Sequence, residues 1–257
     1  MTTFKSARLK IERADEHIAD VDRQIADLRS PERQRITREI NPYTGDQFLH
    51  YDFKSPLPLD DLALVIGDAI HNLKTAIDHG WHTLLSAFAP AVAQSRSSKF
   101  PVYDGDSHQL ESGLRGVKID TLCPPLFRFV VDDLRPYSEG GNSVLCIIHD
   151  LDIRDKHKLL VPLTRITAVV DAVLEDEAGH TTKGATWGTL NEALPITIPI
   201  SAGSKMKVKE YGHLAFDVIL NQGSGIHTLS VSDTLHHFRE VTLGTIEAME
   251  GFFSRTR

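Results

Sequence analysis

The most regular spacing of apolar residues in the chain covers residues 4–29. Apolar side chains recur there at intervals of three and four residues, at Phe4, Ala7, Ile11, Ala14, Ile18, Val21, Ile25 and Leu28. This pattern predicts a long helix whose narrow apolar seam packs against another long helix. The partner helix lies either within the chain or in a second subunit, so a homodimer through residues 4–28 is one expectation.

The following segments predict a hairpin and then more helices. Residues 33–55 hold two β-favouring stretches on either side of "NPYTGD", whose Asn, Pro and Gly residues favour a turn. Further helices are expected at 61–88, 124–137 and 143–160. The intervening residues 90–118 are expected to be mostly loop, with a short helix near 107–114.

From Val161 the pattern changes to β-rich stretches separated by Gly, Ser and Asn. These fit five or six strands, at 161–176, 185–190, 194–201, 205–212, 213–222 and 226–232. A last helix is expected at 232–254. The order of elements predicts an α+β protein rather than an alternating α/β one. Residues 1–160 and 232–257 would form a helical bundle that includes the hairpin at 33–55, and residues 161–231 would form a β-rich insertion packed on the bundle.

The polar side of the 61–88 helix carries short acids, an amide and imidazoles, where a surface that only meets water usually carries Lys and Glu. At about 100° per residue these side chains fall into neighbouring rows. The rows are His71, Asp78 and His82, then Asn72 and His79, with Lys74 at the margin one turn before Asp78, where the two can pair.

The 143–160 helix has a second polar face, formed by Asp150, Arg154 and His157. Asp155 instead falls on the apolar stripe of this helix, and an isolated buried charge is too costly to leave unpaired. We therefore expect the two helices to dock, with Asp155 facing a His, Asn or Lys of residues 71–82. Either a structural polar network or a functional site would account for this cluster of titratable groups.

Two motifs resemble those of known proteins. "GDAIHNLKTAIDHGWHTLL" and the later "HDLDIRDKHKLL" resemble a large group of uncharacterised bacterial proteins with GD-x-x-HNLRSALDHL and L-x-x-I-DKHR helix motifs. The resemblance covers about residues 55–162; Lys74 stands where that group usually has Arg, and Lys158 where it often has Arg. Lys74-Thr75…His79 and Arg154-Asp155-Lys156-His157 bear a weaker similarity to the HEPN superfamily of helical bundles, many of which are RNA-cleaving toxins or nucleotide-binding modules. The motif of that superfamily is an Arg, a polar residue and a His four to six positions later; the first segment has Lys in place of Arg, and the second has a shorter spacing.

The HEPN-like resemblance implies a bundle that binds RNA or a nucleotide, with metal-independent ribonuclease activity as the catalytic form of this hypothesis. His79 and His157 would then exchange protons, and Lys74 and Arg154 would hold phosphate. Asn72, Asp78 and Asp155 would orient these groups, and His71 is a further binding residue. No cofactor is expected.

Two hypotheses from other classes compete with this one. In the first, the chain is a non-enzymatic interaction protein whose polar core is structural and whose β-rich segment binds a protein partner. In the second, His71, Asp78 and His82 bind a metal ion across helices, together with His149 or His157.

The composition narrows the class of protein. The chain has 257 residues, of which 41% are hydrophobic and 25% charged, as in globular domains. The net charge of −7 disfavours a general duplex-DNA coat. No apolar run approaches the roughly 20 residues that span a bilayer, and the first residues lack the apolar core of a signal peptide. A cytoplasmic protein without a membrane partner is therefore expected.

Overall fold

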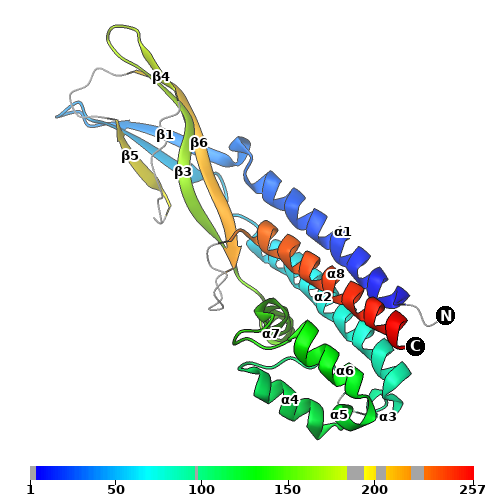
Figure 1. The fold of residues 1–257 in the computed structure, drawn as a ribbon. Coiled ribbons are helices and arrows are strands. Elements are labelled where there is room, and N and C mark those ends of the chain that lie inside the picture. The colour runs from blue at the N-terminus through cyan, green and yellow to red at the C-terminus, as the bar shows by residue number, and fades with distance from the viewer. Residues whose placement is uncertain (1–3, 96–97, 184–193, 201–206, 221–228) are drawn as a thin grey trace.

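The computed structural model describes residues 4–95, 98–183, 194–200, 207–220 and 229–257. Three long helices lie side by side, a β-rich arm projects from one end of them, and shorter helices cover one side of the bundle (Figure 1). The α+β class and the helical bundle expected from the sequence are both present. Within the described residues, no helix combines the length and apolarity needed to cross a membrane.

The bundle consists of α1 (Lys5–Leu28), α2 (Leu59–Phe88) and α8 (Val231–Thr256). The apolar seam of α1 is buried within the chain, because α1 packs against both α2 and α8. Ion pairs flank the α1–α8 contact: Arg8 with Glu250 at 2.6 Å and Arg239 with Asp15 at 3.0 Å. Of the two arrangements expected for the seam, the intramolecular one is therefore observed.

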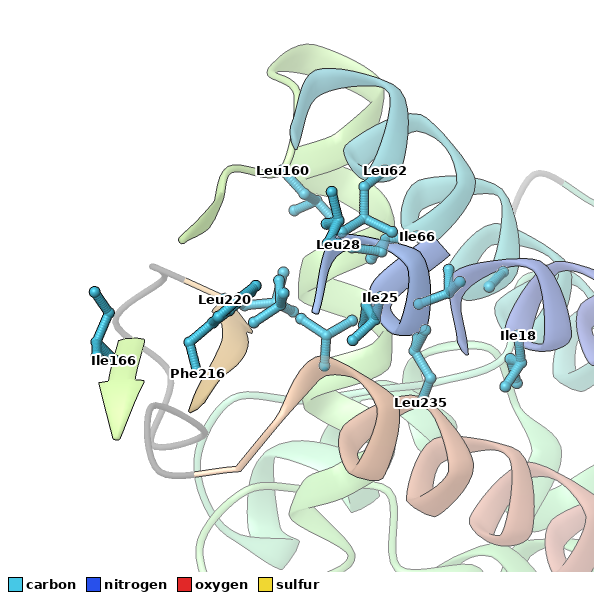
Figure 2. Packing of buried hydrophobic residues seen from close by; sticks show 14 of the residues in the cluster. Ile18, Ile25, Leu28, Leu62, Ile66, Leu160, Ile166, Phe216, Leu220 and Leu235 are labelled. Atoms are coloured by element: carbon cyan, nitrogen blue, oxygen red, sulfur yellow. The ribbon is translucent and has the colours of Figure 1, made fainter. Parts of the chain in front are cut away.

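The apolar core continues from the bundle into the base of the β-rich arm that projects from it (Figure 2). Ile18 and Ile25 of α1 meet Leu235 of α8 in this core, and Phe216 and Leu220 extend it into the arm. A second core lies beneath the shorter helices around Trp81 and Phe100. The two cores together fix the arm and the helical cover on the bundle.

The predicted hairpin is present as β1 (Gln34–Ile40) and β2 (Gln47–Phe53), after a 3-10 turn at Pro31–Arg33. Its turn is stabilised by the Asn41 side chain, whose Oδ1 accepts the backbone N–H of Tyr43 at 2.9 Å. On its other edge β2 pairs with β5 (Ile196–Ile200). The hairpin, which the sequence grouped with the bundle, thus shares a sheet with a strand of the β-rich insertion.

The second sheet has the order β4 (Thr181–Lys183), β3 (Pro162–Glu175) and β6 (Lys207–Leu220). The sequence predicts two separate strands at 205–212 and 213–222, but a single strand, β6, covers the described residues of both. Gly212 does not end the strand: it has φ +65°, and a Cβ there would collide with the carbonyl oxygen of Val170. The strand expected at 185–190 lies outside the described residues.

Buried side chains join the two sheets. The Gln34 amide of β1 donates to the Leu214 carbonyl at 3.0 Å and accepts the Leu214 backbone N–H at 2.6 Å, as a neighbouring strand would. The Tyr51 hydroxyl donates to the Tyr211 carbonyl at 2.6 Å, and burial raises the pKa of Tyr51 to about 12. These contacts unite β1 to β6 into one unit, which we call the β arm.

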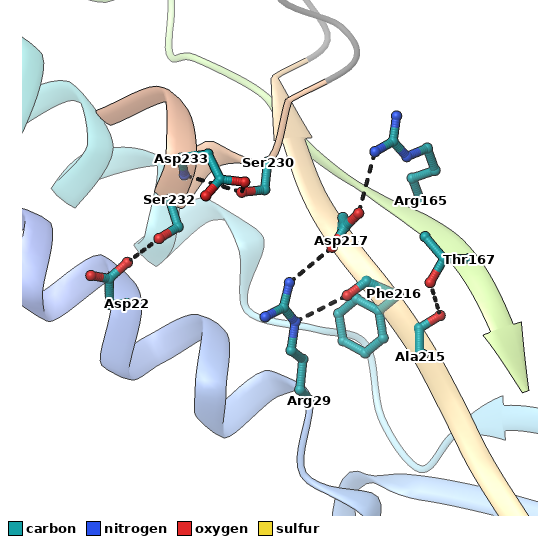
Figure 3. A network of polar contacts seen from close by, with 10 residues as sticks. All are labelled: Asp22, Arg29, Arg165, Thr167, Ala215, Phe216, Asp217, Ser230, Ser232 and Asp233. Carbon is teal, nitrogen blue, oxygen red and sulfur yellow. Dashed lines mark hydrogen bonds and ion pairs between the residues drawn. The ribbon is translucent and has the colours of Figure 1, made fainter. Parts of the chain in front are cut away.

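Polar contacts fix the β arm to the bundle (Figure 3). Arg29, at the end of α1, donates to the Phe216 carbonyl at 3.0 Å and pairs with Asp217 at 3.0 Å. Asp217 also pairs with Arg165 of β3 at 3.2 Å. The C-terminal end of α1 is therefore held against β6, which the Asp217–Arg165 pair connects to β3.

The shorter elements form a helical cover on the bundle: α3 (Pro90–Ala93), α4 (Ser107–Gly116), α5 (Ile119–Leu122), α6 (Pro124–Arg128), a π-helical turn at Phe129–Leu134, and α7 (Ser143–His157). The short helix expected near 107–114 is α4, whose N-cap Asp106 accepts the backbone N–H groups of His108 and Gln109. The α7 helix ends three residues earlier than expected, because Lys158 is already extended.

Candidate functional site

The polar faces of α2 and α7 meet, as the sequence predicts. The two helices run antiparallel: Asp155 lies against Gly67, Asp152 pairs with His71, and the positive charge of Lys74 acts on His149. The C-terminal end of α7 therefore lies beside the first half of α2. This direction decides which of the predicted residues come together.

The central acid of the α2–α7 contact is Asp152, which sequence reasoning missed. It is 4% exposed, and one carboxylate oxygen accepts the Nδ1–H of His71 at 2.8 Å. The other oxygen accepts Lys156 Nζ at 2.6 Å, from one turn further along α7. The buried carboxylate thus has a hydrogen-bond donor on each oxygen, which is what makes a buried charge tolerable.

Asp155 does not pair with a His, Asn or Lys of residues 71–82, so this prediction was wrong. Its carboxylate packs against Gly67, where a Cβ atom would overlap it, and it accepts the backbone N–H of Leu160. Burial raises the pKa of Asp155, and the hydrogen bond from Leu160 opposes that shift. Gly67 was a signal for this contact, because a glycine inside a helix permits the close approach of a neighbouring group.

Lys74 and Asp78 form the expected pair, with Nζ 2.6 Å from Oδ1. The same carboxylate oxygen accepts the backbone N–H of Phe100 at 3.1 Å, so the pair anchors the segment that follows α3 to the bundle. Lys74 is only 4% exposed. An ammonium group that is buried and already neutralised is poorly placed to hold the phosphate of an RNA chain.

Asn72 also has a structural role. Its side-chain oxygen accepts Lys10 Nζ of α1 at 3.1 Å, and its amide donates to the Asp68 carbonyl at 2.8 Å. The residue is buried between α1 and α2. Asn72 therefore connects the two helices and does not face an open site.

The predicted metal ligands are not brought together. His71 is engaged with Asp152 and Asp78 with Lys74, while His82 is exposed on the outer side of α2 beside Ser86. From His71 to His82 the row extends about 16 Å along the helix axis, too far for one ion. In the part of the chain that the structure describes, no three His, Cys, Asp or Glu side chains form a group that could hold a metal.

The predicted catalytic residues are also separated. Arg154 and His157 are exposed near the C-terminal end of α7, where the neighbouring Asp155 lies against Gly67. His79 is twelve residues beyond Gly67 on α2, about 18 Å along the axis. His79 and His157 therefore cannot exchange protons at one phosphodiester, and the shared catalytic site predicted from the sequence is wrong in its geometry.

His149 is the histidine of α7 that lies close to Lys74 and Asp78. Burial lowers its pKa, the charge of Lys74 lowers it further, and Asp150, Asp78 and Asp152 oppose the shift. Its Nδ1 is buried and has no hydrogen-bond partner among the described residues. His149 is therefore a neutral imidazole near pH 7.

Lowering the pH below 6.5 is expected to destabilise the protein partly through His149. In that range the unfolded chain protonates this imidazole, whereas the folded state resists protonation, so stability falls as the pH falls. Urea unfolding of the parent and of His149→Gln between pH 7.5 and 5.5 measures this contribution. The variant should lose less stability across the range, and exposed His82→Gln should follow the parent; equal losses in all three would contradict the assignment.

Comparisons with known proteins leave the sequence motifs as the basis for any family assignment. No protein-family model, curated protein or solved structure matches the chain. The structure does give the motifs a physical explanation, since Gly67 and His71 of the first motif contact Asp155 and Asp152 of the second. Together they form the α2–α7 contact.

Proposed function

We propose that the protein is a non-enzymatic interaction protein in which the polar faces of α2 and α7 are structural. The observation that supports this best is the engagement of the α2 side chains. Lys74 binds Asp78, Asn72 binds Lys10, and His71 binds Asp152. Asn72 and His71 connect α2 to α1 and α7, and the Asp78 that pairs with Lys74 also holds Phe100. The network therefore positions helices and does not present reactive groups.

Apolar side chains at the start of the β arm support a protein partner. Leu159, Val161 and Leu163 are 36%, 44% and 38% exposed, whereas Leu160 between them is fully buried. Exposure alternates along residues 159–163, which is the pattern of a segment whose alternate side chains point to the same side. The three exposed side chains therefore form an apolar strip. Tyr43, at the tip of the hairpin, is 94% exposed. Grouped exposed apolar residues are typical of interaction surfaces.

RNA or nucleotide binding by an HEPN-like bundle is the second candidate. The last turn of α7 supports it, because Arg154, Lys156 and His157 place basic groups there, and Lys158 follows directly. The same helix end carries the negative end of the helix dipole, which works against anion binding. We therefore rank this function below the first.

Assays of RNA cleavage and nucleotide binding on the parent, His79→Ala and His157→Ala test the ranking. We expect no cleavage by any of the three proteins. His79→Ala should lower the free energy of unfolding by about 1 kcal/mol, since the ring is partly buried, and His157→Ala should change it by less than about 0.5 kcal/mol. Urea unfolding measures both values.

A different result would reverse the ranking. If the parent cleaves RNA and each variant loses that activity while remaining folded, the protein is a ribonuclease and the structural interpretation fails. If the parent binds a nucleotide without cleaving RNA, and His157→Ala weakens binding, the second candidate is correct.

A further inference from the structure

A pocket of about 350 Å³ lies between α2, α7 and the segment Lys99–Ile119 that covers them. Its walls include Trp81 of α2, His149 of α7, and Phe100, Tyr103 and Leu114 of the covering segment. None of the residues that the sequence singled out for catalysis lines it. The volume suits a small ligand of one or two rings and is at the low end for a ligand of drug size.

Aromatic rings form much of the pocket wall. Trp81 and Phe100 are almost fully buried and meet edge to face, with ring centroids 6.0 Å apart. The Tyr103 hydroxyl lies where a side chain at Gly113 would be, so the glycine makes room for this ring. A flat aromatic ligand packs favourably against such walls.

Two buried polar atoms of the pocket residues have no hydrogen-bond partner in the described part of the chain. These are Nε1 of Trp81, which is a donor, and Nδ1 of His149. Buried polar groups are almost always paired, so an unpaired donor in a pocket wall points to a bound partner. The indole N–H can donate a hydrogen bond, and a neutral imidazole can accept one through a ring nitrogen. The two residues therefore offer a ligand hydroxyl group one donor and one acceptor.

The one formal charge among the described lining residues is positive, although the chain is acidic overall. Lys99 is exposed at the rim and is the one Lys, Arg, Asp or Glu residue among the described residues that line the pocket. The wall beside it is held in place, because Asp78 accepts the backbone N–H of Phe100. The rim therefore offers a preorganised position for one negative charge.

We propose that this pocket binds a small hydroxyaromatic carboxylate. The ring packs among Trp81, Phe100 and Tyr103, the carboxylate pairs with Lys99, and the ring hydroxyl pairs with the indole N–H of Trp81 and the His149 imidazole. A nucleotide fits less well, because it is larger and because its phosphate carries more negative charge than one lysine can balance. The proposal does not depend on the interaction function.

Titration with 4-hydroxybenzoate, followed by NMR of the Trp81 indole N–H, tests the proposal. A Trp187→Phe background leaves Trp81 as the remaining one of the two tryptophans, so one indole signal is observed. We expect a saturable shift with 4-hydroxybenzoate, and about tenfold weaker binding of benzoate, which lacks the hydroxyl. The uncharged analogue 4-hydroxybenzamide should also bind about tenfold more weakly.

Variants at Lys99 separate the contribution of the charge at the rim from that of a change in the protein's net charge. Lys99→Gln should weaken 4-hydroxybenzoate binding about tenfold and leave 4-hydroxybenzamide binding unchanged. Lys5→Gln, a matched loss of charge on α1, should change the binding of neither ligand. The proposal is overturned if millimolar 4-hydroxybenzoate produces no saturable shift, if the two variants behave alike, or if AMP gives the same shift at lower concentration.

Discussion

An Ile18→Asp variant is expected to lose about 3 kcal/mol of unfolding free energy, a large fraction of the stability of a typical domain. Ile18 is 2% exposed in the seam of α1 and lies in the core that α1 shares with α2 and α8. A carboxylate at this position would be buried without a hydrogen-bond partner, which is among the most destabilising changes that a core can undergo. Urea unfolding followed by circular dichroism measures the loss.

Ala19→Asp is the matched control for this variant, because Ala19 is the next residue of α1 and is exposed. The same aspartate there should cost about 0.5 kcal/mol, as a small loss of helix propensity. Similar losses in the two variants would show that the seam is not buried as described.

A Gln34→Leu variant is also expected to lose about 3 kcal/mol of unfolding free energy. Gln34 is 5% exposed, and its amide satisfies both the N–H and the carbonyl of Leu214. Leucine has a similar size but leaves both backbone groups buried and unpaired, and each such group costs about 1–3 kcal/mol. Urea unfolding gives the total, and hydrogen exchange of the Leu214 amide shows whether that N–H has lost its protection.

Gln47→Leu provides the comparison on the same hairpin. Gln47 is half-buried, and its side-chain hydrogen bond is with Arg38 at the surface. Its replacement should change stability by less than about 0.5 kcal/mol. If Gln34→Leu is as stable as the parent and the Leu214 amide remains protected, the side chain does not join the two sheets.

The bundle and the hairpin were predictable because their signals are local. The spacing of Ile11, Ile18 and Ile25 specifies which side of α1 is buried, and all three are at most 4% exposed. The turn sequence around Asn41 specifies the hairpin in the same way. In both cases neighbouring residues carry the information, so it can be read without knowledge of the rest of the chain.

The pairing of the strands was not predictable from such signals. Tyr51 pairs with Ile196, and nothing near either residue specifies that partner. Gly212 suggested the end of a strand but lies inside β6, because a glycine also allows φ to be positive within a strand. Long-range pairing depends on how whole strands pack, which the local pattern does not contain.

The candidate site was predictable as a contact between helices, but not in its details. A helical pattern defines a broad apolar side, and a small rotation decides which acid at its edge is buried. In α7 the buried side is centred on Leu145, Ile148 and Asp152, so Val144 is only half-buried. Asp155 therefore lies at the edge of the contact, and the antiparallel direction then separates the predicted catalytic residues.

The position of α8 in the sequence also determines the order in which the helices can pack while the protein is being synthesised. The α1 and α2 helices can associate soon after residue 88 has left the ribosome, but roughly 140 residues separate α2 from α8. At a synthesis rate of 5–20 residues per second, that delay is about 7–30 s. Until then the apolar surface that α8 will cover stays exposed on the nascent chain, which favours aggregation during this interval.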